Sequence, residues 1–433
     1  MPIPETGRRE SLCLYAFPAE VARTVFAALC LFVPWAASEV PQVDRAQAPN
    51  FEARKHQTEY NGPGREEREP IDLPEVRIGY FGPAEPSHPS GGSVWEGLQL
   101  GIEQANREGG YRGLPFRLIP VWAADPWSTG VGRLAGAVYH DGVWAIIGGI
   151  DGPSTHLAEQ IVVKARLTLI SPVSSDKTAN LANVPWIFSV APGDHEVAPV
   201  IGAAVADSAG CAPFALISAA EHDSHALASE VRRQLHTRKA EPLCHVEFAS
   251  GTADPHLVGH VLTQQPKIAV LIAGVADSAR MLIALREGGF TGAVIGGPAM
   301  GRRAFLAAAG KAAEGVLFPM LDEPSAGAEE FTVAFQRRTG YAPDYAAAQA
   351  YDSVCLLVTA IRRAGMNRAR IGDAVRELSP WRGVSGIIRW DPLGQNTRTV
   401  RLGTIREGRV EPGTALKRSG RLEEQSGAPR GLR

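Results

Sequence analysis

The sequence has few cysteines, and their spacing suits neither redox nor metal chemistry. Its 433 residues include only Cys13, Cys30, Cys211, Cys244 and Cys355, with no CxxC pair. A zinc site built on cysteine pairs and a thioredoxin-like motif are therefore excluded. Cys211 and Cys244 are the candidates for one disulfide in an oxidising compartment. Because Cys211 precedes one predicted strand and Cys244 lies in another, two separate buried thiols remain the alternative.

Local signatures of catalysis and of nucleic-acid binding are also missing. The sequence contains no P-loop GxxxxGK[ST], no GxSxG elbow and no dinucleotide fingerprint, so we expect neither an enzyme nor a bound cofactor. Lys and Arg number 44 against 46 Asp and Glu, for a net charge of -2, and no long basic stripe occurs. Because phosphate backbones are bound through clustered positive charge, we expect no nucleic-acid partner.

Two histidine pairs have spacings that suit a metal, but neither has a visible third ligand. His256 and His260 are one helical turn apart, and His222 and His225 are three residues apart. The first pair lacks the adjacent glutamate of a zinc hydrolase. Histidines on an exposed helix face explain both spacings, and we expect no metal site.

An apolar run near the N-terminus predicts export. Residues 24–38 follow Arg23, contain almost no polar side chains and end in Ala36-Ala37-Ser38. The run is too short to span a bilayer comfortably, and its small residues suit a signal peptidase, so we predict a signal peptide over residues 1–38. An uncleaved anchor remains the alternative. Lipidation of Cys30 is disfavoured because Leu29, which is not a small residue, precedes it.

The two ends of the chain differ in composition from its middle. Residues 39–74 are polar, contain proline and show no apolar periodicity, which predicts a disordered linker. Residues 411–433 are similar, which predicts a flexible tail. The folded body is then about residues 75–410, long enough for two lobes.

Within this body, short β-branched runs alternate with amphipathic stretches. The order β-α-β-α predicts parallel sheets covered by helices on both faces, which is an α/β fold with two doubly wound lobes. Ligands of such sheets bind beyond the carboxyl ends of the strands. The predicted strands cover residues 76–81, 116–121, 143–148, 167–171 and 186–190 in the first series, and 213–218, 243–248, 268–273 and 293–296 in the second.

Five passages, taken in order, resemble the leucine/isoleucine/valine-binding family of periplasmic solute receptors. They are residues 91–110, 143–155, 167–175, 342–352 and 383–394. The resemblance implies the type I periplasmic binding protein fold, with two lobes joined by three crossings near Pro192, near Pro319 and just after Asn396. It places lobe one at 75–191 and 320–396, and lobe two at 192–319 with a closing strand at 397–410.

The resemblance also implies function. It implies an exported, non-catalytic and monomeric receptor that closes on a small amino acid, amide or carboxylate and delivers it to an ABC permease. A sensor subunit that uses the same closure remains an alternative. A relict or scaffolding protein with an altered pocket is another.

Two strand-to-helix corners are the first candidates for ligand contact. Residues 151–155 place backbone N–H groups and hydroxyls at a helix start, where an anion is favoured. Residues 173–175 form a second corner, and in the family the matching loops hold the ligand carboxylate. The alternative is that Ser154, Thr155 and Ser175 only cap helices. The candidates are Asp151, Gly152, Ser154, Thr155, Val173, Ser174 and Ser175.

The opposite wall departs from the family pattern. Two aromatic positions of the family are matched by Asp223 and Val275, and its acidic position by Ala299. The family's pocket for the ligand ammonium is therefore altered. Asp223 replaces the lost charge from the other wall or, alternatively, caps its own helix. Trp127, in a loop after a strand, is one more candidate for lining the cleft.

Overall fold

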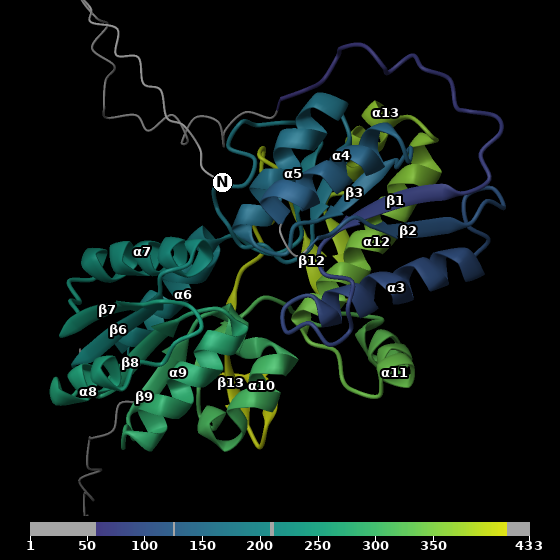
Figure 1. Cartoon of the computed structure of the whole chain (residues 1–433). Helices are drawn as coiled ribbons and strands as arrows, with labels where there is room; N and C mark the ends of the chain where they lie inside the picture. Colours follow the sequence, from purple (N-terminus) through teal and green to yellow (C-terminus); the bar gives the residue numbers. More distant parts are fainter. Residues whose placement is uncertain (1–57, 124–125, 208–211, 414–433) are drawn as a thin grey trace, which may run out of the picture. The chain divides into compact units, whose positions relative to one another are not determined.

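The computed structural model describes residues 58–123, 126–207 and 212–413. Within them the chain forms two large sheets, each covered by helices on both faces, and one small two-stranded sheet (Figure 1). We call the five-stranded sheet with its helices the first lobe and the seven-stranded sheet with its helices the second lobe. The predicted α/β fold with two doubly wound lobes is confirmed.

The first lobe contains a fully parallel sheet in the order β2-β1-β3-β4-β5. Its strands are β1 (Val76–Phe81), β2 (Phe116–Pro120), β3 (Ala145–Gly148), β4 (Thr168–Ser171) and β5 (Ile187–Ser189). Its helices are α3 (Gly92–Arg107), α4 (Val131–Tyr139), α5 (Gly152–Ala165), α11 (Ala328–Thr339), α12 (Tyr345–Ala364) and α13 (Arg368–Glu377), with a small hairpin of β11 (Trp381–Gly383) and β12 (Gly386–Ile388).

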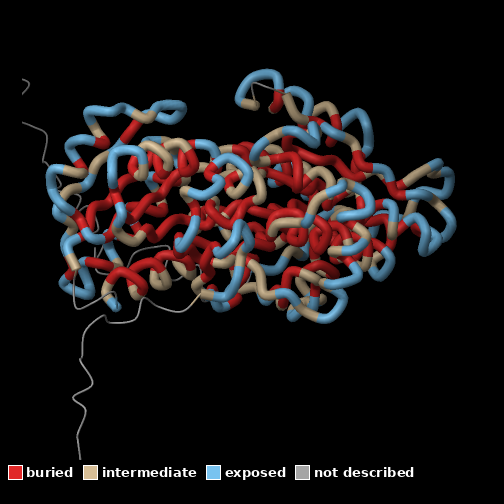
Figure 2. Tube along the Cα trace, turned by 90° about the horizontal axis from the view of Figure 1, so that it is seen from below, coloured by how far each residue is buried: buried red, intermediate tan, exposed pale blue. Residues whose placement is uncertain are grey.

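The alternating direction of side chains along the strands explains why helices cover both faces of this sheet. Tyr80 packs with the side chains of α3 and α12, while its neighbour Phe81 packs on the opposite face with those of α4 and α5. Side chains of successive strand residues point to opposite faces of the sheet. A continuous apolar run is therefore buried only when helices pack on both faces. Figure 2 shows the result as buried segments inside and exposed segments at the periphery.

The second lobe contains a mixed sheet in the order β14-β13-β10-β9-β8-β6-β7. Its strands are β6 (Phe214–Ala219), β7 (Cys244–Phe248), β8 (Ile268–Ile272), β9 (Ala293–Gly296), β10 (Leu317–Met320), β13 (Arg401–Arg406) and β14 (Arg409–Pro412). Its helices are α6 (Asp194–Asp207), α7 (His222–Thr237), α8 (Pro255–Thr263), α9 (Val275–Glu287) and α10 (Arg303–Ala309). The single closing strand expected over 397–410 is instead an antiparallel hairpin, so β14 takes in the first residues of the predicted tail.

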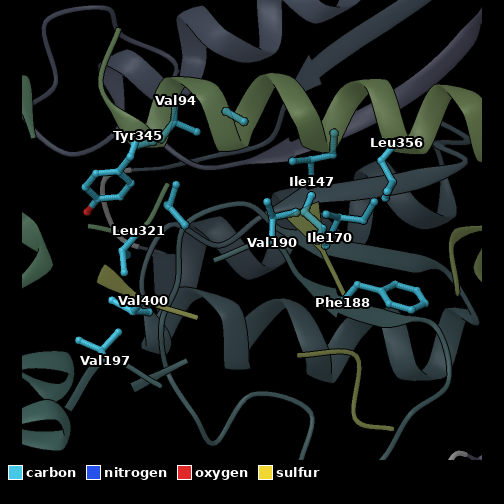
Figure 3. Close-up of a cluster of buried hydrophobic side chains, with 14 of the residues drawn as sticks. Val94, Ile147, Ile170, Phe188, Val190, Val197, Leu321, Tyr345, Leu356 and Val400 are labelled. Carbon is cyan, nitrogen blue, oxygen red and sulfur yellow. The ribbon is translucent and has the colours of Figure 1, made fainter. Parts of the chain in front are cut away.

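The chain passes between the lobes three times. It leaves the first lobe after β5, returns after β10 and leaves again after Asn396, which pairs with Pro192 and whose amide donates to the Val190 carbonyl at 2.7 Å. One apolar core continues through these passes. Figure 3 shows Leu321 and Val400 of the passes lying between Tyr345 and Val197, and all four belong to the same buried cluster.

Residues 58–74 do not behave as the disordered linker that the sequence predicts. Tyr60 packs edge to face on Trp186 with ring centroids 5.2 Å apart. The Asn367 amide donates to the Gly64 carbonyl at 2.8 Å, and Arg112 pairs with Glu69 at 2.9 Å. Aromatic and polar contacts of this kind hold the segment to the first lobe. Because they need no regular spacing of apolar residues, the sequence shows no apolar periodicity there.

The predicted signal peptide and residues 39–57 lie outside the described residues. Within residues 58–123, 126–207 and 212–413, no helix combines the length and the apolar character that a membrane span requires. Cys244 and Cys355 are free thiols, while Cys211, the other half of the candidate disulfide, lies outside the described ranges.

Candidate functional site

A cleft of about 380 Å³ lies between the two lobes, beyond the carboxyl ends of several strands. The first lobe and the pass after β10 line it with Ser90, Ile150, Asp151, Pro153, Val173, Ser175, Leu321 and Tyr345. The second lobe lines it with Glu221, His222, Asp223, Ser224, Leu227, Ile272, Ala273, Gly274, Val275, Gly297, Pro298, Ala299 and Arg302. This volume is at the small end of ligand pockets.

The first corner is the start of α5, where the hydroxyls serve the helix. Asp151 is the N-cap, and its carboxylate accepts a hydrogen bond from the Ser154 N–H at 2.8 Å. The Ser154 hydroxyl accepts from the Asp151 N–H at 3.3 Å, and the Thr155 hydroxyl donates to the Asp151 carbonyl at 2.7 Å. Ser154 and Thr155 are buried and do not line the cleft. The Ser154 hydroxyl completes the capping box of Asp151, while the Thr155 hydroxyl bonds back to the Asp151 carbonyl and caps no N–H.

The N–H of Gly152 is held by a carboxylate of the opposite lobe. It donates to both oxygens of Asp223, each at 3.0 Å. Burial raises the pKa of Asp223 to about 7, although the Gly152 N–H lowers it, and the charges of Asp151 and Glu221 add to the rise. Glu221, not Asp223, is the N-cap of α7. Asp223 therefore occupies the anion position at the start of α5.

The second corner is not the strand-to-helix corner that the sequence predicts, because β4 leads through turns into β5, so Ser175 caps no helix. The corner contributes two of its three residues to the cleft. Val173 and Ser175 line the cleft, whereas Ser174 is buried and its hydroxyl accepts from the Asp176 N–H at 3.4 Å. The Ser175 carbonyl accepts from the Asp194 N–H at 2.7 Å. The corner thus shapes the wall and connects the first lobe to the start of α6.

The second-lobe wall is short and apolar around α9. Val275 and Ala299 line the cleft as expected, beside Gly274 and Gly297. None of these side chains offers a charge or a ring for an ammonium group. The carboxylates of Asp151, Glu221 and Asp223 make the cleft acidic instead.

Trp127 does not take part in the cleft. It lies in the short π-helical turn Pro126–Gly130, is 60% exposed and is absent from the lining. The turn that carries it continues directly into α4.

Arg302 is a site residue that the sequence did not reveal. Its guanidinium donates to Asp344 at 2.9 Å, to the Ser90 carbonyl at 2.7 Å and to the Ser93 hydroxyl at 3.0 Å. Burial alone would lower the pKa of Arg302, but the Asp344 carboxylate outweighs it and raises the pKa. This arginine of the second lobe is thereby anchored in the first. No local motif marks such a residue, because its partners lie far away in sequence.

His156, Asp176 and His222 form a second unpredicted group at the edge of the cleft. The Nε2 atoms of both imidazoles lie close to the same Asp176 carboxylate oxygen, at 3.0 Å for His156 and 2.9 Å for His222. Hydrogen bonds to Asp176 and Glu159 raise the pKa of His156 to about 10. Among the described residues, neither histidine pair singled out by spacing gains a third ligand, and His222 joins this group instead.

The chain resembles solved solute-binding proteins along most of its length. It matches the leucine-binding protein LivK from Thermotoga maritima with 21% identity and a TM-score of 0.70, covering 78% of this chain and 98% of that one. LivJ from Streptococcus pneumoniae, solved with isoleucine, matches with 21% identity and a TM-score of 0.72 over 78% and 98% of the two chains. A solute-binding protein from R. palustris, solved with benzoate, matches with 15% identity and a TM-score of 0.70 over 78% and 95%.

These likenesses establish the type I periplasmic binding protein fold. No curated protein matches the chain. The model of one family matches residues 75–409, more than three quarters of the sequence. The chain therefore belongs to the periplasmic binding protein family.

Proposed function

We propose that the protein is the exported, non-catalytic substrate-binding component of an ABC transporter of the branched-chain amino acid type. The observation that carries this proposal is the cleft between the lobes, where Asp151 and Ser175 from one lobe face Asp223 from the other. A cleft with polar groups from two hinged bodies suits a receptor that closes on its ligand. The apolar run over residues 24–38 supports export, and an ABC permease is the proposed partner.

The ligand that suits this cleft is a small amino acid or amide rather than a carboxylate without an amine. Arg302 is the cation of the lining, and Asp344 already neutralises it. A carboxylate of the ligand replaces Asp223 as the acceptor of the hydrogen bond from the Gly152 N–H. The released Asp223 carboxylate then pairs with the ammonium or amide N–H of the ligand. The short side chains of Val275 and Ala299 leave room for the rest of the ligand.

A thermal-shift screen of the purified full-length protein tests this proposal. Ligands that bind only the folded state stabilise it, by about 2.7 kcal/mol at a hundredfold excess over Kd. We expect branched and small amino acids or their amides to raise the midpoint, and carboxylates lacking an amine, such as benzoate, to have little effect. Asp223→Asn removes the shift, whereas Asp207→Asn, at an exposed position at the end of α6, preserves it.

Two outcomes contradict parts of the proposal. Stabilisation by amine-free carboxylates alone overturns the role of Asp223 as the partner of an ammonium group. Failure of every amino acid, amide and carboxylate to stabilise the protein overturns the receptor function and favours a relict pocket.

A further inference from the structure

Three side chains with metal-binding atoms meet where the two lobes face each other. His156 lies on α5, Asp176 follows β4 and His222 is the first residue of α7, so two come from the first lobe and one from the second. One nitrogen of each imidazole and one carboxylate oxygen all lie within 4.8 Å of one another. The imidazole rings are nearly perpendicular, with centroids 6.2 Å apart. Two imidazoles and one carboxylate are a ligand set that zinc uses in proteins.

Neighbouring groups hold these side chains in place. Glu159 contacts Nδ1 of His156 at 3.0 Å, which leaves Nε2 directed at Asp176. The N–H and hydroxyl of Thr178 donate to the second oxygen of Asp176 at 2.7 and 2.6 Å. A carboxylate behind a histidine ligand and hydrogen bonds behind a carboxylate ligand are the usual supports of a metal site.

The group has access to solvent, and no side chain at position 152 crowds it. The Asp176 side chain is 2% exposed, but the imidazoles of His156 and His222 are 31% and 48% exposed. Gly152 lies beside the group, and a Cβ at that position would approach Asp176 Oδ2 to 2.5 Å. The absence of a side chain at Gly152 therefore lets the three groups converge.

We propose that His156, Asp176 and His222 bind a divalent transition-metal ion such as Zn²⁺, which links the two lobes and stabilises their closed arrangement. The nitrogen-to-oxygen distances of 2.9 and 3.0 Å are shorter than the roughly 3.3 Å between two ligands of a tetrahedral zinc ion, so a small outward shift of the rings admits the metal. Solvent supplies the remaining ligand. Because His222 is the one ligand from the second lobe, the ion favours the closed state over an open one.

Isothermal titration of the metal-free, full-length protein with ZnCl₂ tests this site, which is independent of the transport function. We expect one ion per chain. His156→Gln and His222→Gln each weaken binding by more than about 100-fold, and Glu159→Gln, which removes only a supporting group, weakens it by about 10- to 100-fold. The matched control is His225→Gln. His225 lies on the same helix as His222, is exposed and faces Glu247 instead, so its loss leaves binding unchanged.

Small-angle scattering distinguishes a link between lobes from binding to one lobe. Zinc shifts the wild-type protein toward the closed arrangement and has no such effect on His222→Gln. The circular dichroism of each metal-free variant shows whether it is folded, and both histidine positions are partly exposed, so the two variants do not depend on a core substitution. Absence of zinc binding, or binding that is unchanged in both histidine variants, overturns the proposal.

Discussion

The two walls of the cleft are built in different ways. The first-lobe wall consists of the strand-to-helix corner before α5, where Asp151 caps the helix and the Gly152 N–H points at an anion, and of the loop after β4. The second-lobe wall combines the short side chains of Val275 and Ala299 with the carboxylates of Glu221 and Asp223. Both walls carry carboxylates, and the first adds the backbone N–H of Gly152 as a hydrogen-bond donor. Under the proposed function, the Gly152 N–H of the first wall binds the anionic group of the ligand, and the second wall selects among ligands.

The largest expected effect comes from Arg302, which crosses from the second lobe into the first. Arg302→Met leaves the Asp344 carboxylate buried without a counter-charge, and we expect a loss of about 3–5 kcal/mol in the free energy of unfolding. Urea denaturation measures it. Arg112→Met breaks the exposed pair with Glu69 and costs less than about 1 kcal/mol. Equal losses in the two variants would show that the buried pair has no special role.

Gly152 is where the two walls touch, so a side chain there separates them. Gly152→Ala places a Cβ against Asp176 and Asp223, and we expect ligand affinity to fall by about 10- to 100-fold, measured by titration with the best amino acid of the screen. Gly132→Ala on α4 meets open space and keeps the affinity of the wild type. Unchanged affinity in Gly152→Ala would mean that the walls need not approach each other.

Asp223 gives the second wall a pH dependence. Its pKa is raised from 3.8 to about 7, so the folded protein binds this proton more tightly than the unfolded chain does. The stability from this group is therefore complete below about pH 4 and is lost as the pH rises through 7, by about 2 kcal/mol after allowance for partial exposure. Urea denaturation at pH 4.5 and 7.5 measures it. Asp223→Asn removes this component, and an unchanged pH profile in the variant would refute the assignment.

The smallest effect is expected on the outer face of the first lobe. Trp127→Ala changes ligand affinity by less than twofold and stability by less than about 0.5 kcal/mol, because the ring is exposed and outside the cleft. Ligand titration and urea denaturation measure the two quantities. A tenfold loss of affinity would restore Trp127 as a ligand contact.

Local sequence patterns predicted the parts of the molecule that depend on neighbours in the chain. Strand and helix periodicity predicted the two sheets, and residues 151–155 predicted the start of α5, although its N-cap is Asp151 and not Ser154 or Thr155. Arg302 was missed because Asp344 and Ser90 are far away in sequence. His156, Asp176 and His222 come from three segments, so no spacing rule reveals them.

The contacts of residues 58–74 with the first lobe determine which lobe bears a force on the N-terminal end of the chain. Tyr60 touches Trp186, Asn367 donates to Gly64, and Arg112 and Tyr111 hold Glu69, all on the first lobe. Tension applied to the chain ahead of Tyr60 is therefore borne by the first lobe alone. If the protein is held at its N-terminal end, the first lobe stays in place, and the second lobe is the part that moves when a solute is taken up or released.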